Sequence, residues 1–412
     1  MPPSRQLTRR QIYRRRRIVV FGGLALALAS FIYLPMTLLA PLRVAEVTLT
    51  VPEEPTPEVP ALDFPGYGSS AVGAVGYPGV LAQAGATKPQ PMASITKVIT
   101  ALVVLEKHPL GVDEEGPKIT MDARDLAFYS EQLAMNGSVA PVSAGMTFSE
   151  RDLLELTLVK SANNYTMSLA RWAFGDNAAF LKAARAWLAD HGLDKIKILE
   201  PTGIDADNVA PADQLVELGR IALEHPVVAD IVASKNVRVP ELGKLPNTNA
   251  LLGVDGVDGI KTGTLDTFGA NLLFSADYLV GEHPVTIVGV VLGGPDHDRI
   301  NRDIRDLLKT ALANFTEVEV AADDEPFATY RTVWGAETQA VAAGRVTLLT
   351  WAGEPVLAEV TTTEIRTGEA GTDVGRVVLT SGPSSAVVDL ELATDLDDPG
   401  PWWRLTNPGL LF

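Results

Sequence analysis

The chain has 412 residues, of which 46% are hydrophobic and 21% charged, so it has enough apolar surface to offset the entropy of folding. It contains no cysteine, which excludes disulfides, thiolate metal sites and cysteine nucleophiles. The net charge is −17 although the first 17 residues hold seven arginines and no acid, so the rest of the chain repels phosphate polymers and no nucleic-acid partner is expected.

The first 40 residues predict a membrane anchor. Residues 1–17 form a basic segment, and residues 18–40 contain no charged side chain. At ~1.5 Å per helical residue this run can cross a hydrocarbon core of ~30 Å. Because arginines favour the cytoplasmic side, we expect a single-pass membrane protein with a cytoplasmic amino terminus and an extracytoplasmic body. A cleaved signal peptide is the alternative, but its apolar region is usually only ~7–15 residues long.

The body begins with a spacer and then mixes strands and helices. Residues 41–65 are predicted to be a proline-rich linker, because five prolines between 51 and 65 favour an extended chain. Residues 66–316 form the next domain. Glycine-punctuated apolar runs predict two strands within 66–84. Residues 94–107 are apolar on nearly every side, which predicts a buried helix.

Further elements follow in the same domain. An amphipathic helix is predicted over 150–160, with Ser149 as its amino-terminal cap. The remaining elements are predicted as helices 178–191 and 213–224, strands 269–277 and 284–292, and helix 298–315. Strands at both ends with helices between them predict one sheet assembled from both ends of the domain.

Residues 317–412 are predicted to form a small, separate all-β domain. Trp402 and Trp403 are expected in a strand that fills its core, with an exposed docking patch as the alternative. Runs of alternating or β-branched residues predict strands at 345–351, 355–365, 375–380 and 386–394.

The sequence gives no support to metal or nucleotide chemistry, so no cofactor is expected. Each histidine lies beside Pro, Gly or Asp in an apparent turn, and no pair has zinc-ligand spacing. No P-loop or dinucleotide-binding fingerprint is present. We therefore treat all five histidines as structural or incidental: His108, His191, His225, His283 and His297.

Ser94 and Lys97 form the first candidate catalytic motif. In a helix that begins at Ser94, the lysine lies one turn later on the same face. The serine can act as a nucleophile if a neutral lysine takes its proton, and burial or a second cation lowers the lysine pKa toward that state. Alone, this pattern also describes a capping serine followed by a solvated lysine.

Two further motifs follow in order. Ser161 and Asn163 lie at a helix–loop junction and offer a hydroxyl that can relay a proton and an amide that can hold a peptide group. Lys261, Thr262 and Gly263 end a strand-like run and offer a cation, a hydroxyl and close backbone approach to an extended anionic ligand. Each motif alone could be a simple turn, but the three together are typical of penicillin-binding proteins and class A β-lactamases.

The chain resembles the serine-type D-alanyl-D-alanine carboxypeptidases, which are low-molecular-mass penicillin-binding proteins. The resemblance covers about residues 66–316 and is carried by PMASITKVITALVVLE, VSAGMTFSERDLLELTLVKSANN and VDGIKTGTLDTFGANLLFSA. It implies an α+β, β-lactamase/transpeptidase-like fold, in which an antiparallel sheet with helices carries an inserted helical lobe. The carboxy-terminal all-β domain and the amino-terminal transmembrane helix complete the expected architecture.

The resemblance also implies a peptidoglycan stem peptide ending in D-Ala-D-Ala as the substrate, and β-lactam antibiotics as acylating ligands. Ser94 would attack the penultimate carbonyl with Lys97 as the general base. Ser161 would help to pass the proton to the departing D-alanine, and Asn163 would hold the substrate backbone. Water would then release the acyl-enzyme.

The third motif would bind the carboxylate end of the substrate. The resemblance implies that Lys261 adds positive potential and also keeps the first lysine neutral, that Thr262 hydrogen-bonds the carboxylate, and that Gly263 permits close approach. Backbone N–H groups of Ser94 and Thr264 would form the oxyanion hole. Many family members have histidine where this chain has Thr264.

Other functions remain open from the sequence. A D,D-endopeptidase would use the same residues. A β-lactamase needs a water activated by a carboxylate, and although Glu200 precedes Pro-Thr-Gly, no glutamate loop of that type is evident. A non-catalytic wall-binding or β-lactam-sensing module is the third alternative, but it would have no need of a neutral Lys97.

Many members of the carboxypeptidase family carry an acidic residue where this chain has Asn164.

Overall fold

The computed structural model describes residues 8–50 and 61–412 and divides into two compact units. Of the described residues, the first unit contains 61–317 and 349–353. The second contains 8–50, 318–348 and 354–412. Most of the five-proline stretch and the first seven basic-segment residues lie outside the described residues.

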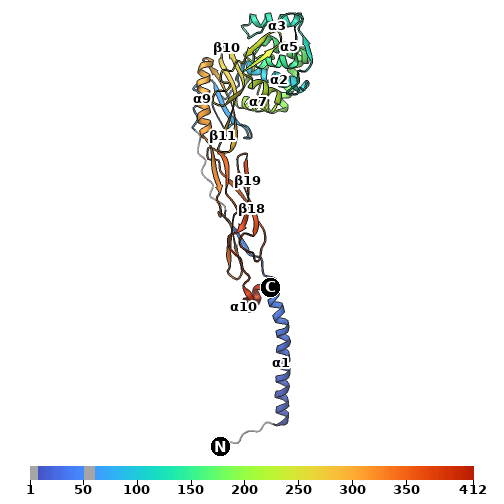
Figure 1. Ribbon diagram of the computed structural model, residues 1–412, viewed down its shortest axis with the longest axis vertical. Coiled ribbons are helices and arrows are strands. Elements are labelled where there is room, and N and C mark those ends of the chain that lie inside the picture. Colours follow the sequence, from blue (N-terminus) through green and yellow to red (C-terminus); the bar gives the residue numbers. More distant parts are fainter. Residues whose placement is uncertain (1–7, 51–60) are drawn as a thin grey trace. The chain divides into compact units, whose positions relative to one another are not determined.

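The first unit (Figure 1) is built on a five-stranded antiparallel sheet, whose strands lie in the order β10-β11-β12-β2-β3. Strands β2 and β3 come from the start of the unit and β10, β11 and β12 from its end, so the prediction of a sheet assembled from both ends is confirmed. The strands are β2 (Ser69–Ala74), β3 (Ala82–Gly85), β10 (Val257–Leu265), β11 (Gly269–Val280) and β12 (His283–Gly294).

Each face of this sheet has its own hydrophobic core. Leu273 and Val290 lie in the core that holds helices α2 (Thr96–Lys107), α7 (Ala212–Glu224) and α8 (Pro226–Ala233). Their neighbours Leu272 and Val291 lie in the other core, against helix α9 (His297–Ala313). Adjacent strand residues point to opposite faces, and both faces are buried, which explains why these strands are continuously apolar rather than alternating.

A helical lobe is inserted between β3 and β10. The serine cap predicted for a helix over 150–160 is confirmed at α4 (Glu150–Leu158), since Ser149 Oγ accepts from the Asp152 backbone N–H at 3.0 Å. The lobe and its flanks contain helices η1 (Ala93–Ile95), α3 (Ala123–Ala134), α4 (Glu150–Leu158), α5 (Asn163–Phe174) and α6 (Asn177–Asp190). Three short ribbons pair β4 (Gln90–Pro91) with β7 (Val209–Ala210), β5 (Lys118–Thr120) with β6 (Thr147–Ser149), and β8 (Asn236–Val239) with β9 (Gly243–Pro246).

The second unit holds a six-stranded antiparallel sheet in the order β1-β14-β15-β19-β18-β17. Strands β13 (Phe315–Ala321) and β16 (Val346–Trp351) pair with each other. The sheet strands are β1 (Glu46–Leu49), β14 (Pro326–Arg331), β15 (Glu337–Ala342), β17 (Leu357–Thr362), β18 (Asp373–Ser381) and β19 (Ser384–Leu392).

Two predictions in this unit are wrong. Residues 46–49, which we expected in an extended linker, form β1 and pair with β14. The partner strand lies more than 270 residues later, so no local pattern could reveal the pairing. The segment with Trp402 and Trp403 is not a strand, since residues 400–411 form helices α10 (Gly400–Thr406) and α11 (Pro408–Leu411), each with proline in its first turn.

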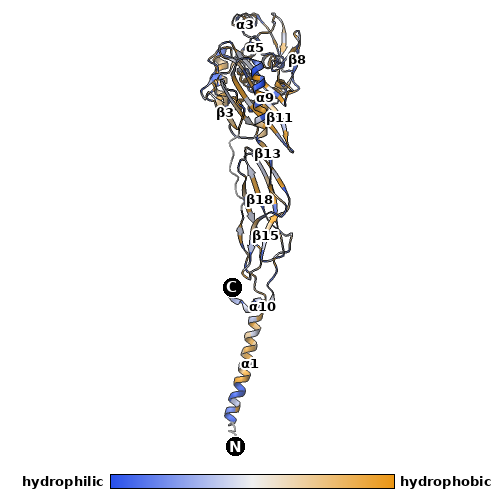
Figure 2. Cartoon of the chain, turned by 90° about the vertical axis from the view of Figure 1, so that its left-hand side faces the viewer, coloured by the Kyte–Doolittle hydropathy of each residue, from blue (hydrophilic) through white to orange (hydrophobic). Residues whose placement is uncertain are grey.

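Helix α1 (Arg9–Leu38) has the length and composition needed to cross a membrane. Its most apolar window has no residue buried by the rest of the chain. Figure 2 shows this helix as hydrophilic near its amino-terminal end and hydrophobic along most of its length. The helix therefore fits the predicted anchor in its extent and its charge asymmetry.

Candidate active site

The first motif sits where the short turn η1 leads into helix α2. Ser94 lies in η1, half-buried, and Lys97 lies in the first turn of α2 with none of its surface exposed. Lys97 Nζ is 2.7 Å from Ser94 Oγ. The amine and the hydroxyl are thus in direct hydrogen-bond contact, as a nucleophile and its base require.

The surroundings of Lys97 favour its neutral form. Complete burial lowers the pKa of Lys97 from 10.5 to about 7, although the negative charge of Glu200 acts in the opposite direction. Lys97 Nζ also donates to the carbonyl oxygen of Thr202, at 2.9 Å. The lysine is therefore held by one carbonyl and the serine, with a substantial neutral fraction at neutral pH.

Glu200 builds the loop that supplies this carbonyl. Its carboxylate accepts from the backbone N–H groups of Thr202 and Gly203 at 2.7 and 2.6 Å, and from Asn208 Nδ2 at 3.1 Å. It also accepts from the hydroxyl of Thr202 at 2.7 Å. These bonds fix the loop that faces Lys97. This role of Glu200 is not evident from the sequence, because the loop is more than 100 residues from the lysine it contacts.

The second motif lies between α4 and α5. Ser161 adopts a left-handed backbone conformation with φ of 60° and is 6% exposed, and Asn163 is 3% exposed. Asn163 Nδ2 donates to Gln132 Oε1 at 2.8 Å, which orients the amide. Its Oδ1 is buried and has no hydrogen-bond partner among the described residues. A buried acceptor without a partner is costly, so this oxygen is ready to accept an N–H from a bound ligand.

The third motif lies on β10, the edge strand of the sheet. A methyl group at Gly263 would lie 3.1 Å from the backbone nitrogen of Ser94 and 3.0 Å from Ala93 Cβ. A side chain here would push η1 away by a few tenths of an ångström, so glycine favours the close approach that brings the backbone of the third motif against the first. Thr262 Oγ1 lies 2.6 Å from Thr248 Oγ1, which fixes the hydroxyl at the edge of the site.

Lys261 lies behind Thr262 and is 1% exposed. Its Nζ donates to the Thr262 carbonyl oxygen at 3.1 Å. Burial, and then the charge of Lys97, hold the pKa of Lys261 well below its usual range. The two lysines therefore oppose each other's charge, and an anionic ligand beside Thr262 would favour the protonated form of Lys261.

These motifs converge on one pocket of about 500 Å³. Lys97 and Lys261 lie behind its wall, where they are hydrogen-bonded to Ser94 and Thr262 respectively. Across the pocket, Asn136 Nδ2 lies 3.4 Å from Asp266 Oδ2, so the helical lobe touches the turn after β10. The predicted residues on the pocket wall are Ser94, Ser161, Asn163, Thr262, Gly263 and Thr264.

His297 is a pocket residue that its sequence pattern did not predict. We expected it to be incidental in a turn, but its Nε2 lies 2.8 Å from Thr264 Oγ1 and the ring lines the pocket. Burial, and then the charge of Lys261, lower its pKa, while Asp296 and Asp298 act in the opposite direction. His297 lies just after the apolar strand β12, at the start of α9. This position at the end of a strand was the one feature of the sequence that could have indicated a pocket residue.

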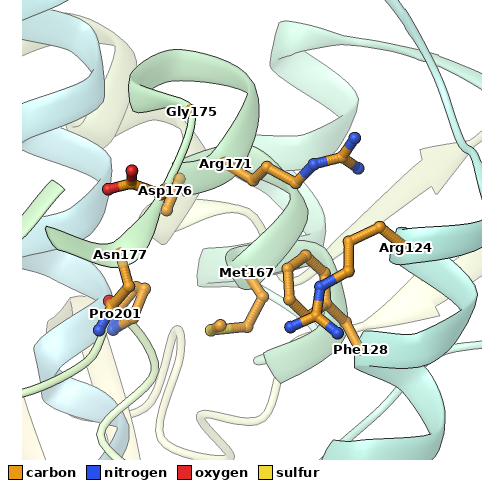
Figure 3. A pocket seen from close by; sticks show the side chains of 9 residues that line it. Arg124, Phe128, Met167, Arg171, Gly175, Asp176, Asn177 and Pro201 are labelled. Carbon is orange, nitrogen blue, oxygen red and sulfur yellow. The ribbon is translucent and has the colours of Figure 1, made fainter. Parts of the chain in front are cut away.

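A second pocket, of about 240 Å³, lies in the helical lobe and contains none of the predicted residues. Figure 3 shows Phe128 and Met167 near each other, with the Arg124 guanidinium over the Phe128 ring and Arg171 pointing away from both. Both arginines are engaged in ion pairs, with Glu131 and Asp122 respectively. Among residues 8–50 and 61–412, no group of three or more His, Asp or Glu side chains could hold a metal ion.

Known proteins resemble the part of the chain that carries the three motifs. The D-alanyl-D-alanine carboxypeptidase family matches residues 77–295. A D-alanyl-D-alanine endopeptidase of Escherichia coli (strain K12) is 30% identical over 206 residues, which are 48% of this chain and 63% of that protein. One of Pseudomonas aeruginosa is 35% identical over 139 residues, 34% of this chain and 42% of that protein. D-alanyl-D-alanine carboxypeptidase DacC of Escherichia coli is 28% identical over 279 residues, 65% of this chain and 68% of that protein. The matches therefore span less than two thirds of both endopeptidases.

Solved structures share the fold. Penicillin binding protein 5 from Haemophilus influenzae has a TM-score of 0.57 at 21% identity, and the match covers 83% of this chain and 99% of that chain. The Streptomyces K15 DD-transpeptidase has a TM-score of 0.54 at 21% identity, covering 63% of this chain and 99% of that chain. This likeness confirms the predicted α+β, transpeptidase-like architecture.

Proposed function

Because the chain belongs to the D-alanyl-D-alanine carboxypeptidase family, we propose that it is a serine carboxypeptidase that removes the terminal D-alanine from peptidoglycan stem peptides. The observation that carries this proposal is the 2.7 Å contact between Lys97 Nζ and Ser94 Oγ, with the lysine fully buried. A binding module would gain nothing from burying an amine in this way, whereas a nucleophilic serine needs a neutral base.

Acylation follows from this geometry. Neutral Lys97 takes the hydroxyl proton as Ser94 attacks the penultimate carbonyl carbon, and a C–O bond forms while the peptide C–N bond breaks. The leaving amine needs a proton, which Ser161, on the pocket wall, relays from Lys97. The backbone N–H groups of Ser94 and Thr264 stabilise the oxyanion, each worth roughly 3–4 kcal/mol in comparable sites. Water then hydrolyses the ester.

Substrate orientation comes from the remaining residues. The unpartnered Oδ1 of Asn163 accepts an N–H of the stem peptide. The terminal carboxylate binds beside Thr262, and its charge draws Lys261 into the protonated form. His297 supports this end of the pocket through Thr264. β-Lactams, which carry a carboxylate and a strained carbonyl, would acylate Ser94 in the same way.

The D,D-endopeptidase reaction is the second candidate, because the two relatives of 30% and 35% identity carry that name. It cleaves a cross-link with the same residues and differs in the group that leaves. The β-lactamase alternative is disfavoured, because the Glu200 carboxylate is occupied by loop donors and is not free to activate water.

We also propose that α1 anchors the protein in the membrane with the basic residues in the cytoplasm and the pocket outside. The supporting observations are the length of the apolar helix and the arginines at its amino-terminal side. Peptidoglycan lies outside the cytoplasmic membrane, so this orientation brings the pocket to its substrate.

One experiment tests the chemistry. The full chain in detergent is incubated with a labelled penicillin, and the modified peptide is mapped. We expect one covalent adduct, on Ser94, which is absent in Ser94→Ala and formed far more slowly in Lys97→Ala. Labelling that persists in Ser94→Ala would refute the assignment.

A second assay separates the candidate reactions. A pentapeptide ending in D-Ala-D-Ala releases free D-alanine if the protein is a carboxypeptidase, and a cross-linked peptide dimer yields monomers if it is an endopeptidase. Binding of the pentapeptide without release of D-alanine would support the non-catalytic alternative.

A further inference from the structure

One charged side chain lines the pocket that holds Ser94. Among the described residues on the pocket wall, Asp266 is the only aspartate, glutamate, lysine or arginine. The ring of His297 also lines the pocket, but burial lowers its pKa, so it is mostly uncharged at neutral pH. The wall therefore presents a negative charge at Asp266 that the catalytic motifs do not use.

The Asp266 carboxylate has no cationic partner. Asp266 is exposed in the turn between β10 and β11, and in the described part of the chain its carboxylate is in no ion pair. Asn136 Nδ2 lies 3.4 Å from Oδ2, but an amide does not neutralise a carboxylate.

The turn itself does not account for this carboxylate. Aspartate is common in turns, because its side chain can accept a backbone N–H two residues later. Here the N–H of Phe268 donates instead to the carbonyl oxygen of Leu265, at 3.0 Å. The Asp266 carboxylate is thus left facing the pocket rather than bound into the turn.

The direction proposed for the substrate brings one of its residues close to Asp266. Strand β10 is at the edge of the sheet, so an extended ligand can lie along it. In the proposed function, the terminal carboxylate binds beside Thr262 and the penultimate carbonyl faces the backbone N–H of Thr264. An extended peptide advances ~3.3 Å per residue, as a strand does. The third residue from the carboxyl end therefore lies about one strand position beyond Thr264, next to Leu265 and Asp266.

A carboxylate at this place favours a cationic group on the substrate. An ammonium group on a flexible stem of several carbons can reach a charged side chain one or two strand positions away. At the other end of the site, Lys261 behind Thr262 favours the terminal carboxylate. The site would thus match a peptide that is anionic at its end and cationic on a side chain two residues earlier.

We propose that Asp266 is a specificity-determining residue, which binds an ammonium group on the side chain of the third residue from the carboxyl end of the substrate. The proposal rests on the carboxypeptidase function proposed above, and it narrows the substrate class to stem peptides that carry a free amine at that residue. An amine that has been acylated is uncharged and loses this contact.

The test uses peptides that differ in one side chain. Each is an N-acetyl tripeptide ending in D-Ala-D-Ala, and its first residue is lysine, Nε-acetyl-lysine or glutamate. Release of D-alanine by the full chain in detergent gives kcat/KM for each peptide with the wild type, Asp266→Asn and Asp266→Lys. Asp190→Asn is the matched control, because Asp190 is an exposed aspartate on α6 of the same unit and does not line the pocket.

We expect the wild type to prefer the lysine peptide to the Nε-acetyl-lysine peptide about threefold to fivefold, as an exposed ion pair allows. The preference should shrink at high salt, disappear in Asp266→Asn and persist in Asp190→Asn. In Asp266→Lys it should turn toward the glutamate peptide. Equal kcat/KM for the lysine and Nε-acetyl-lysine peptides in the wild type, or a preference that survives in Asp266→Asn, would overturn the subsite.

A binding measurement separates the subsite from the proposed chemistry. The same peptides are titrated by calorimetry into Ser94→Ala and into the double variant that also carries Asp266→Asn. If the wild type releases no D-alanine, but Ser94→Ala binds the lysine peptide more tightly and the double variant does not discriminate, the subsite stands and the carboxypeptidase assignment fails. Release of D-alanine without discrimination has the opposite meaning. Absence of binding by every peptide would overturn both.

Discussion

Acylation of Ser94 is expected to slow steeply below neutral pH, because the base that we propose for it, Lys97, is a buried lysine. Burial lowers the pKa of Lys97 from 10.5 to about 7, and only the neutral amine can accept the serine proton. A shift of this size corresponds to about 5 kcal/mol of preference for the neutral form.

The magnitude follows from the neutral fraction of Lys97. About half of the lysine is neutral at pH 7, and only about 1% is neutral at pH 5, so the second-order rate of acylation should fall roughly 50-fold between them. A solvated lysine would already be more than 99% protonated at pH 7 and would show no inflection near neutrality. A buried Lys97 and a solvated lysine therefore predict different dependences of the acylation rate on pH.

The assay is the rate of covalent labelling by a penicillin between pH 5 and pH 9, with Ser94→Ala as the blank. Glu200→Gln provides a second test, because the Glu200 charge raises the pKa of Lys97. Its removal should shift the inflection to lower pH, whereas Glu106→Gln, an exposed carboxylate change on the same helix α2, should not. A rate that is constant from pH 5 to 8, or an inflection that moves upward in Glu200→Gln, would refute the assignment of Lys97 as the base.

Three further predictions concern other parts of the first unit. Gly137→Ala should reduce kcat/KM at least about tenfold with the fold intact, because the new methyl would lie 2.6 Å from Asn163 Nδ2. Gly66→Ala is the control and should have no effect, because its new methyl would have no atom within 4 Å. Equal activities of the two variants would contradict the role of Asn163. His297→Ala should raise KM for a pentapeptide more than it lowers kcat, because it removes support from Thr264; an unchanged KM would exclude His297 from substrate binding. Burial raises the pKa of Glu150 from 4.5 to about 7, so this residue contributes stability below pH 4.5 that is lost as the pH rises to 7. Glu150→Gln should therefore raise Tm at pH 8 but not at pH 4. A lower Tm of the variant at pH 8 would contradict the expected destabilisation by the ionised carboxylate.

The sequence was sufficient where a property depends on near neighbours. Ser149 is a helix cap because its hydroxyl reaches an amide three residues later, and Ser94 meets Lys97 because one helical turn separates them. The buried helix α2 followed from its lack of a polar face. The strands of the central sheet followed from apolar runs between glycines, whereas helices α3, α5 and α8 were not predicted.

The sequence was insufficient where a property depends on distant segments. The Thr202 carbonyl meets a lysine 105 residues away, and His297 meets a threonine 33 residues away. Strand β1 pairs with a strand more than 270 residues later, and Trp402 was placed in a strand although it lies on an exposed helix. None of these contacts leaves a periodic pattern in the local sequence.

The amino-acid order alone thus determined which chemical groups the protein carries and which of them are one turn apart, since hydrogen bonding and side-chain direction within a helix are local. Only the tertiary structure decided that strand β10 passes against η1 at Gly263, that a glutamate-built loop closes over Lys97, and that residues 400–412 pack on α1. Those outcomes depend on how cores formed by remote segments fit together, and that fit is a property of the whole folded chain.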